Sequence, residues 1–139
     1  MSIPLLQLNS VRQAYGKQAV IHDLTLTLQK GKIGCLLGPS GCGKTTALRC
    51  IAGFEPVLAG EIFLNGVCVS SADVFVPPER RRIGMVFQDY ALFPHLDVAA
   101  NIGFGLHRLT AAERTRRIDE LLHVVHLTEA SEKYPHELS

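Results

Sequence analysis

The sequence lacks a long apolar segment, since no run approaches the ~20 residues that a membrane-spanning helix requires. Its N-terminus also lacks the basic-then-apolar layout of a secretory signal peptide. We therefore expect any role at a membrane to come through a partner protein. The net charge is also small, only +1 over 139 residues. It gives no reason to propose a nucleic acid or an anionic membrane as a partner.

The cysteines form no metal-binding or redox pattern. Cys35, Cys42, Cys50 and Cys68 include no C-x-x-C pair, so their spacing predicts neither a metal site nor a disulfide framework. We expect small buried side chains in a reducing cytosol. Cys42 is the candidate for a reactive thiol, because it lies in a glycine-rich loop beside Lys44.

The glycine-rich loop fits the pattern G-x-x-x-x-G-K-[ST] at every fixed position. It consists of Gly38, Pro39, Ser40, Gly41, Cys42, Gly43, Lys44, Thr45 and Thr46. Glycines let main-chain N–H groups approach anionic oxygens, and a helix start adds further donors and a favourable dipole. In this pattern the Lys44 ammonium reaches the β- and γ-phosphates of a nucleotide and the Thr45 hydroxyl binds Mg²⁺. Thr46 is expected to donate to a phosphate nearer the sugar.

The flanking sequence favours a nucleotide-phosphate site over a glycine-rich turn that binds nothing. The apolar run 32–37 is typical of a buried parallel strand before the loop. Residues 47–52 predict a largely buried helix after it, and Gly53 predicts the end of that helix. The motif therefore has the strand and the helix that it requires.

Strand patterns precede the loop. Residues 5–11, 19–21 and the strictly alternating 24–28 predict an antiparallel sheet beside the nucleotide-binding core. Tyr15 lies in the turn predicted at 15–18. Its ring either stacks on a purine base or caps the sheet edge, and its position does not decide between the two.

A hairpin and a second buried strand are predicted after the helix. Asn65-Gly66 favours a type I′ turn between residues 61–64 and 67–69. The basic run 79–82 predicts a solvated entry to a strand at 83–87. Gln88 follows at the carboxyl end of that strand, where open α/β sheets bind ligands. Its amide either reaches Mg²⁺ or the attacking water, or is a solvated strand-end side chain.

The last third of the chain predicts helices. Asp97 is an expected N-cap for a helix closed by Gly105, and residues 110–113 form a capping box for a longer helix. Before them, Tyr90 and Phe93 either form a docking surface or fold inward onto the domain.

Taken together, these motifs resemble those of ABC-transporter ATPase subunits, over essentially all 139 residues. The loop matches the family's Walker A motif, Tyr15 its adenine-stacking aromatic residue and Gln88 its Q-loop glutamine. Leu138-Ser139 match the first two residues of its signature L-S-G-G-Q. The resemblance implies ATP and Mg²⁺ as cofactors, Val20 against the adenine, Thr45 and Gln88 at the metal, and a catalytic role for Gln88.

The resemblance also implies an α/β fold: a P-loop NTPase core with an N-terminal antiparallel β subdomain and the start of a helical subdomain. The first part spans about 1–96, through the Q-loop, and the helical part about 97–139. The family places its Walker B aspartate and catalytic glutamate after the signature. We therefore expect a truncated chain, unable to hydrolyse ATP by itself, of an ABC-type transport ATPase (a translocase).

Partners and substrate follow from the same resemblance. It implies a second ATPase subunit in a homodimer, integral membrane permease subunits, indirectly a periplasmic binding protein, and no nucleic acid. The expected location is the cytoplasmic face of the inner membrane. Segment 77–95 resembles bacterial importers of ferric iron, polyamines, sulfate and sugars, and ferric iron is the first expectation. A soluble ABC-type ATPase acting on DNA or ribosomes, and a non-catalytic regulatory module, are the alternatives from other classes.

Overall fold

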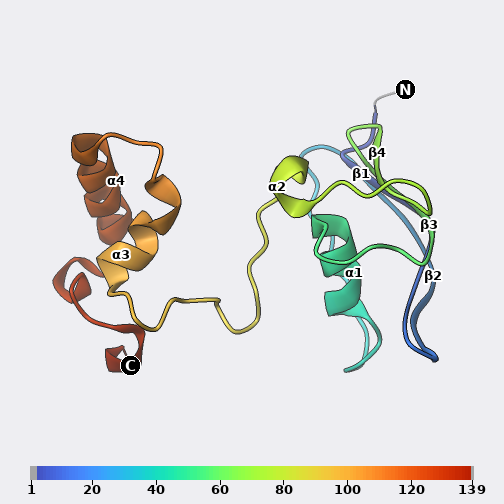
Figure 1. Ribbon diagram of the computed structural model, residues 1–139, viewed down its shortest axis with the longest axis horizontal. Helices are drawn as coiled ribbons and strands as arrows, with labels where there is room; N and C mark the ends of the chain where they lie inside the picture. The colour runs from blue at the N-terminus through green and yellow to red at the C-terminus, as the bar shows by residue number, and fades with distance from the viewer. Residues whose placement is uncertain (1–2, 139) are drawn as a thin grey trace. The chain divides into compact units, whose positions relative to one another are not determined.

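Four antiparallel strands form one sheet in the order β2-β1-β3-β4. In the computed structural model, which describes residues 3–138, they are β1 (Leu6–Tyr15), β2 (Gln18–Leu28), β3 (Ala59–Leu64) and β4 (Val67–Ser70). The sheet belongs to the first of two units, which divide between Met85 and Val86 (Figure 1). No helix within residues 3–138 is long and apolar enough to cross a membrane.

The antiparallel sheet confirms the strand patterns in the sequence. Leu24 and Leu26 pack against the core, whereas Thr25 and Thr27 are exposed, as strict alternation requires. The β3–β4 hairpin turns at Asn65-Gly66, where both residues have positive φ (49° and 78°). A type I′ turn needs this backbone conformation at both central positions.

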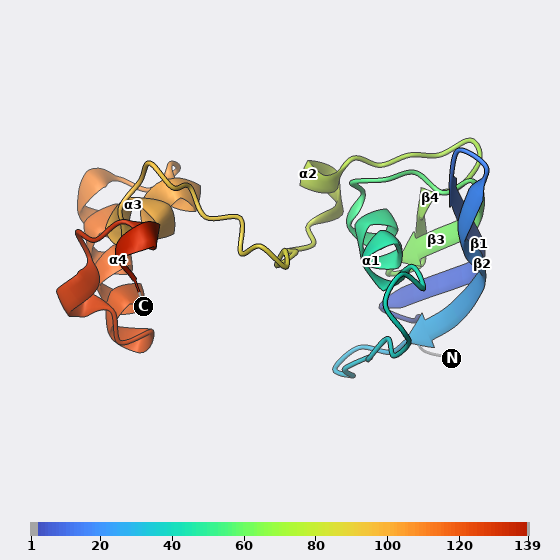
Figure 2. The ribbon, with the colours of Figure 1, turned by 90° about the horizontal axis from the view of Figure 1, so that it is seen from below.

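Helix α1 (Lys44–Ala52) lies along the sheet (Figures 1 and 2). Its Cys50 is fully buried in a cluster with Leu8, Val11 and Ile62 from β1 and β3. The helix ends at Gly53 as predicted, with a left-handed φ of 90° and an N–H that donates to the Arg49 carbonyl at 2.9 Å. The sheet therefore holds the helix that begins at the glycine-rich loop 38–46, which is called the phosphate loop below.

The two apolar runs predicted to be buried parallel strands belong to none of the strands among residues 3–138. Segment 32–37 has Ile33 99% exposed and Leu37 88% exposed, and Val86 in segment 83–87 is 88% exposed. Cys35 is exposed with its segment, contrary to the expectation of a buried thiol. The physical reason is that a parallel strand is stabilised by neighbours on both edges. Among residues 3–138, no strand pairs with either segment.

Arg81, at the end of the short helix α2 (Pro78–Arg81), corrects the prediction of a solvated basic run. Its side chain is 6% exposed, lies over the Phe75 ring at 5.4 Å, and donates four hydrogen bonds to main-chain carbonyls. The acceptors are Val76, Cys50, Ile51 and Val69, at 2.6, 2.6, 3.0 and 3.0 Å. Burial lowers the pKa of the guanidinium. Arg81 therefore joins the end of α1 to β4.

The second unit is helical. It contains α3 (Val98–Gly103), α4 (Ala111–Val124) and 3₁₀ turns at Phe104–Leu106, Thr128–Ala130 and Pro135–Glu137. The predicted N-caps are confirmed: the Asp97 carboxylate accepts the Ala100 N–H at 2.7 Å, and Thr110 and Glu113 form the capping box. Gly105 does not close the first helix as predicted, because α3 ends at Gly103 and the chain continues as the 3₁₀ turn that contains Gly105. The subdomain boundary expected near residue 96 stays a prediction.

Candidate phosphate-binding site

The phosphate loop leads directly into α1. Gly43 is the N-cap with a left-handed φ of 89°, and Lys44 is the first helical residue. The first turn of an α-helix has N–H groups without intrahelical acceptors, and its dipole favours an anion. Thr45 is exposed at this turn, whereas Thr46 is 8% exposed. The start of α1 is therefore suited to a phosphate group.

The Lys44 ammonium is folded over the loop. It donates to the carbonyl oxygens of Gly38 and Pro39, at 2.8 and 2.7 Å, and contacts the Cys42 sulfur at 3.4 Å. These contacts keep a positive charge beside the glycine-rich backbone. Charge-assisted hydrogen bonds are among the stronger ones in proteins, so the ammonium has a preferred position before a ligand arrives.

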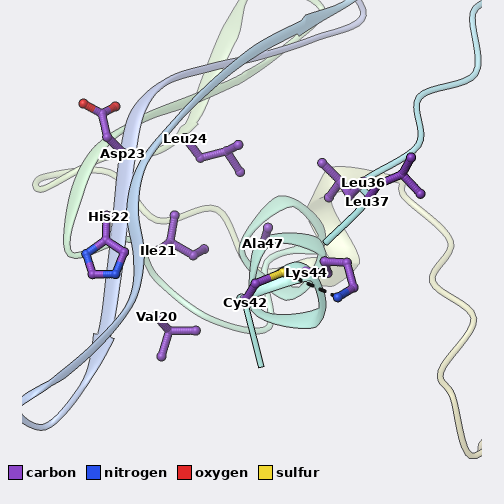
Figure 3. A pocket seen from close by; sticks show the side chains of 11 residues that line it. Val20, Ile21, His22, Asp23, Leu24, Leu36, Leu37, Cys42, Lys44 and Ala47 are labelled. Carbon is purple, nitrogen blue, oxygen red and sulfur yellow. Dashed lines mark hydrogen bonds between the residues drawn. The ribbon is translucent and has the colours of Figure 1, made fainter. Parts of the chain in front are cut away.

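A cavity of about 290 Å³ lies between β2 and the start of α1 (Figure 3). The β2 wall combines apolar residues with His22 and Asp23, and the opposite wall carries the Lys44 charge, which suits an anionic group at the Lys44 end. The lining residues are Val20, Ile21, His22, Asp23, Leu24, Leu36, Leu37, Cys42, Gly43, Lys44 and Ala47.

The cavity brings together part of the predicted site. Val20, Cys42, Gly43 and Lys44 line it, whereas the other predicted loop residues and Tyr15 do not. Gln88 is exposed and belongs to the second unit, so its role at a metal or in catalysis stays a prediction. The same holds for Thr45 as a metal ligand.

Tyr15 lies at the end of β1 and is 49% exposed. The turn is shorter than predicted, because Tyr15 and Gln18 pair as strand residues and only Gly16 and Lys17 connect them. The Tyr15 hydroxyl donates a hydrogen bond to the Glu55 carboxylate. The ring is thus anchored at its hydroxyl, and half of its surface is free.

Sequence reasoning missed His22, Asp23 and Glu55. His22 and Asp23 lie between two runs whose patterns predict separate strands, and one continuous β2 brings them to the cavity wall. The alternation of residues 24–28 does not continue through His22 and Asp23, because the register between β1 and β2 shifts between the pairs Val11–Leu24 and Gln13–Ile21, so no local pattern joins the two runs. Glu55 has no local signal either, because its partner Tyr15 is 40 residues away in the sequence.

Residues 21–139 match a protein-family model described as ABC transporter. The chain is 48% identical over 138 residues to the putrescine transport ATP-binding protein PotG of Escherichia coli K12, covering 98% of this chain and 36% of that protein. It is 41% identical, with the same coverages, to the spermidine/putrescine import ATP-binding protein PotA of Haemophilus influenzae. The chain thus spans about a third of the length of these curated relatives.

A solved structure supports the predicted fold class. The dimeric, post-hydrolysis ATP-binding cassette MJ0796 bound to ADP and Pi matches with a TM-score of 0.80 and 26% identity, covering 96% of this chain and 63% of that one. The ferric-ion expectation finds no support in PotG and PotA, which are polyamine transport proteins. The resemblance of segment 77–95 is shared by several importer groups, so it is too coarse to identify a substrate.

Proposed function

Because the chain belongs to the ABC transporter family, we propose that it binds ATP with Mg²⁺ and is the ATP-binding subunit of a polyamine importer. The observation that carries the substrate class is the 48% identity to a putrescine transport ATP-binding protein over 98% of this chain. The resemblance of segment 77–95 includes polyamine importers as well as ferric iron importers. The names of the two relatives favour polyamines.

In the proposed site, Lys44 and the N–H groups at the start of α1 hold the phosphates. The Thr45 hydroxyl and the Gln88 amide oxygen are hard oxygen donors of the kind that Mg²⁺ prefers, and Gln88 also orients the attacking water. Tyr15 stacks on the base and Val20 packs beside it. Mg²⁺ supplies charge neutralisation between the phosphates when it is bound.

The proposed assembly is a homodimer on the permease subunits of an importer, at the cytoplasmic face of the inner membrane, with a periplasmic binding protein delivering the substrate. A structural neighbour described as dimeric and bound to ADP and Pi supports the dimer. The names of the curated relatives, which are transport and import proteins, support transport over a soluble ATPase acting on nucleic acid.

The nucleotide site is tested by calorimetry on the full-length protein. Lys44→Ala is expected to weaken ATP binding by at least about 100-fold, because hydrogen bonds to charged groups contribute about 1.5–3 kcal/mol each and Lys44 reaches two phosphates. Lys30→Ala, which changes an exposed lysine outside the loop, is the matched control. Equal ATP affinity for wild type and Lys44→Ala would contradict the phosphate-loop assignment.

The substrate class is tested by uptake in cells that depend on this system. Labelled putrescine and spermidine are expected to enter cells that carry the wild-type subunit but not cells that carry Lys44→Ala, while both kinds of cell take up ferric iron equally. If Lys44→Ala abolishes iron uptake and leaves polyamine uptake unchanged, the polyamine assignment is overturned and the ATP-binding proposal still stands.

A further inference from the structure

Glu55 connects the predicted base-stacking residue to the helix that begins at the phosphate loop. The Tyr15 hydroxyl donates a hydrogen bond to Glu55 Oε2, and Arg49 Nη1 lies 3.3 Å from Glu55 Oε1. Each carboxylate oxygen therefore has its own partner. The Glu55 side chain is only 17% exposed, against 45% for Arg49, so its orientation is constrained by packing as well as by bonding.

Arg49 is itself fixed by the end of α1. Its main-chain carbonyl accepts the N–H groups of Gly53 and Phe54, both at 2.9 Å, in the turn that stops the helix. The chain then reverses direction and returns Glu55 to the Arg49 side chain. The position of the carboxylate is thus set by α1 and its C-terminal turn.

The opposite end of α1 is the phosphate-binding end. Lys44 is its first residue, and α1 has nine residues, a length of about 13 Å at 1.5 Å per residue. A helix of this kind is a rigid spacer between the Lys44 ammonium and the anchored phenol of Tyr15. The phosphates and the base of a nucleotide also lie at a restricted separation, so a fixed spacing of these two residues suits a nucleotide.

We propose that Glu55 is a positioning residue, which holds the Tyr15 ring where a purine base stacks while the phosphates occupy the loop. The inference rests on the proposed ATP site and adds a determinant of specificity to it: Glu55 favours a nucleotide over a polyphosphate without a base. The half-exposed ring, held at its hydroxyl, keeps its π-face available for that contact.

The experiment measures ATP and inorganic tripolyphosphate binding to the full-length protein. Glu55→Ala and Tyr15→Phe are each expected to weaken ATP binding about three- to tenfold, since each removes the hydrogen bond that positions the ring and so loses part of the stacking energy of about 1–3 kcal/mol. Tripolyphosphate affinity is expected to change less than about twofold, because it makes no base contact. The double variant is expected to be no weaker than Glu55→Ala, since the two changes act through one bond.

Two further variants separate positioning from a general loss of structure. Glu55→Gln keeps an acceptor for the Tyr15 hydroxyl and is expected to retain ATP affinity within about twofold. Glu61→Ala removes an exposed carboxylate from β3, in the sheet that contains Tyr15, and is the matched control. Thermal unfolding of each variant identifies any that do not fold.

Three outcomes overturn the inference. They are unchanged ATP affinity in Glu55→Ala, equal losses for ATP and tripolyphosphate, and a Glu55→Gln variant as weak as Glu55→Ala. Failure of the ATP proposal itself gives a different result. The wild-type protein then binds neither ligand, or it binds both ligands no more tightly than the Lys44→Ala variant does. The inference therefore fails separately from the function on which it rests.

Discussion

A Cβ atom added to Gly43 would lie 2.6 Å from the carbonyl oxygen of Val20, so β2 packs directly against the N-cap of α1. Real Cβ atoms do not approach main-chain oxygens so closely. This contact ties the sheet to the phosphate loop, and it explains why glycine is needed at this position for space as well as for its left-handed φ of 89°.

Gly41 supplies the matched comparison. Its φ is +81°, close to that of Gly43, but an added Cβ would meet nothing within 4 Å. Both alanine variants suffer the strain of a left-handed residue, about 1–2 kcal/mol. We expect Gly43→Ala to lower the free energy of unfolding by about 2 kcal/mol more than Gly41→Ala, because only Gly43→Ala forces β2 and α1 apart. Urea denaturation measures the difference, and equal losses would contradict the contact.

Arg81→Ala is expected to destabilise the first unit by about 3 kcal/mol or more, because buried carbonyl oxygens lose their donors. Arg81→Lys is expected to rescue little of this loss, since an ammonium is a point charge and cannot reach three separate segments as a guanidinium does. The control is Arg80→Ala, an exposed neighbour whose change is expected within about 0.5 kcal/mol. If thermal and urea unfolding give the same free energy of unfolding for Arg81→Ala and Arg80→Ala, the buried hydrogen bonds of Arg81 do not stabilise the fold.

These contacts mark the limit of what the sequence predicts. Gly53, Asn65-Gly66 and the Thr110 capping box act over a few residues, and local pattern predicts each of them correctly. Arg81 is not predicted, because one of its acceptors is 31 residues away and a basic run looks the same whether or not one member is buried. The parallel strands are predicted from their apolar composition, but a strand also requires partners that composition does not supply.

The candidate site divides in the same way. The loop and its helix follow a motif with fixed spacing, so the amino-acid sequence alone is enough to select residues 38–46. The wall opposite the loop, which includes His22 and Asp23, depends on how β2 packs against α1. The hydrogen bond from Tyr15 to Glu55 depends on that packing as well, and no local spacing encodes it.

The thiol of Cys50 is expected to resist alkylation at pH 8, while Cys35 and Cys42 react. Cys50 is fully buried, and burial, with a smaller contribution from the Glu55 carboxylate, raises the pKa of its thiol from 9.0 to about 11. The thiolate is the reactive form, and Cys35 and Cys42 are exposed. Iodoacetamide labelling followed by peptide mass spectrometry assigns each site. Cys50 labelling at the rate of Cys35 in the folded protein would contradict the burial.

The same raised pKa predicts a loss of stability at alkaline pH. The folded state binds the Cys50 proton more tightly than the unfolded state, so this contribution is complete below pH 9.0 and is lost as pH rises toward about 11. We expect the free energy of unfolding to fall by up to about 2 kcal/mol more in wild type than in Cys50→Ala over that interval. Urea denaturation at pH 8 and pH 10.5 measures it, and parallel pH dependences would refute the assignment.

Asn101 organises the turn that precedes α3. Its side-chain oxygen accepts the Phe93 N–H at 2.9 Å, and its amide nitrogen donates to the carbonyls of Phe93, Leu96 and Asp97, at 3.1, 2.9 and 3.0 Å. The turn also carries the contact between the Phe93 and Phe104 rings, whose centroids are 4.2 Å apart. One amide therefore holds the aromatic segment that the sequence marks as a candidate docking surface.

Asn101→Asp tests this arrangement because it keeps the shape and the acceptor but replaces the donor with a carboxylate oxygen facing three carbonyl oxygens. We expect a loss of about 2 kcal/mol or more at neutral pH, since the carbonyls lose their donor and a negative charge is placed against them. Protonation of the new carboxyl restores a donor, so part of the loss is expected to be recovered near pH 4. Asn65→Asp makes the same change in an exposed type I′ turn, where aspartate is accepted, and is expected to be nearly neutral. Hydrogen exchange at the Phe93 amide reads the turn directly: protection unchanged in Asn101→Asp at neutral pH would mean that the amide does not hold it.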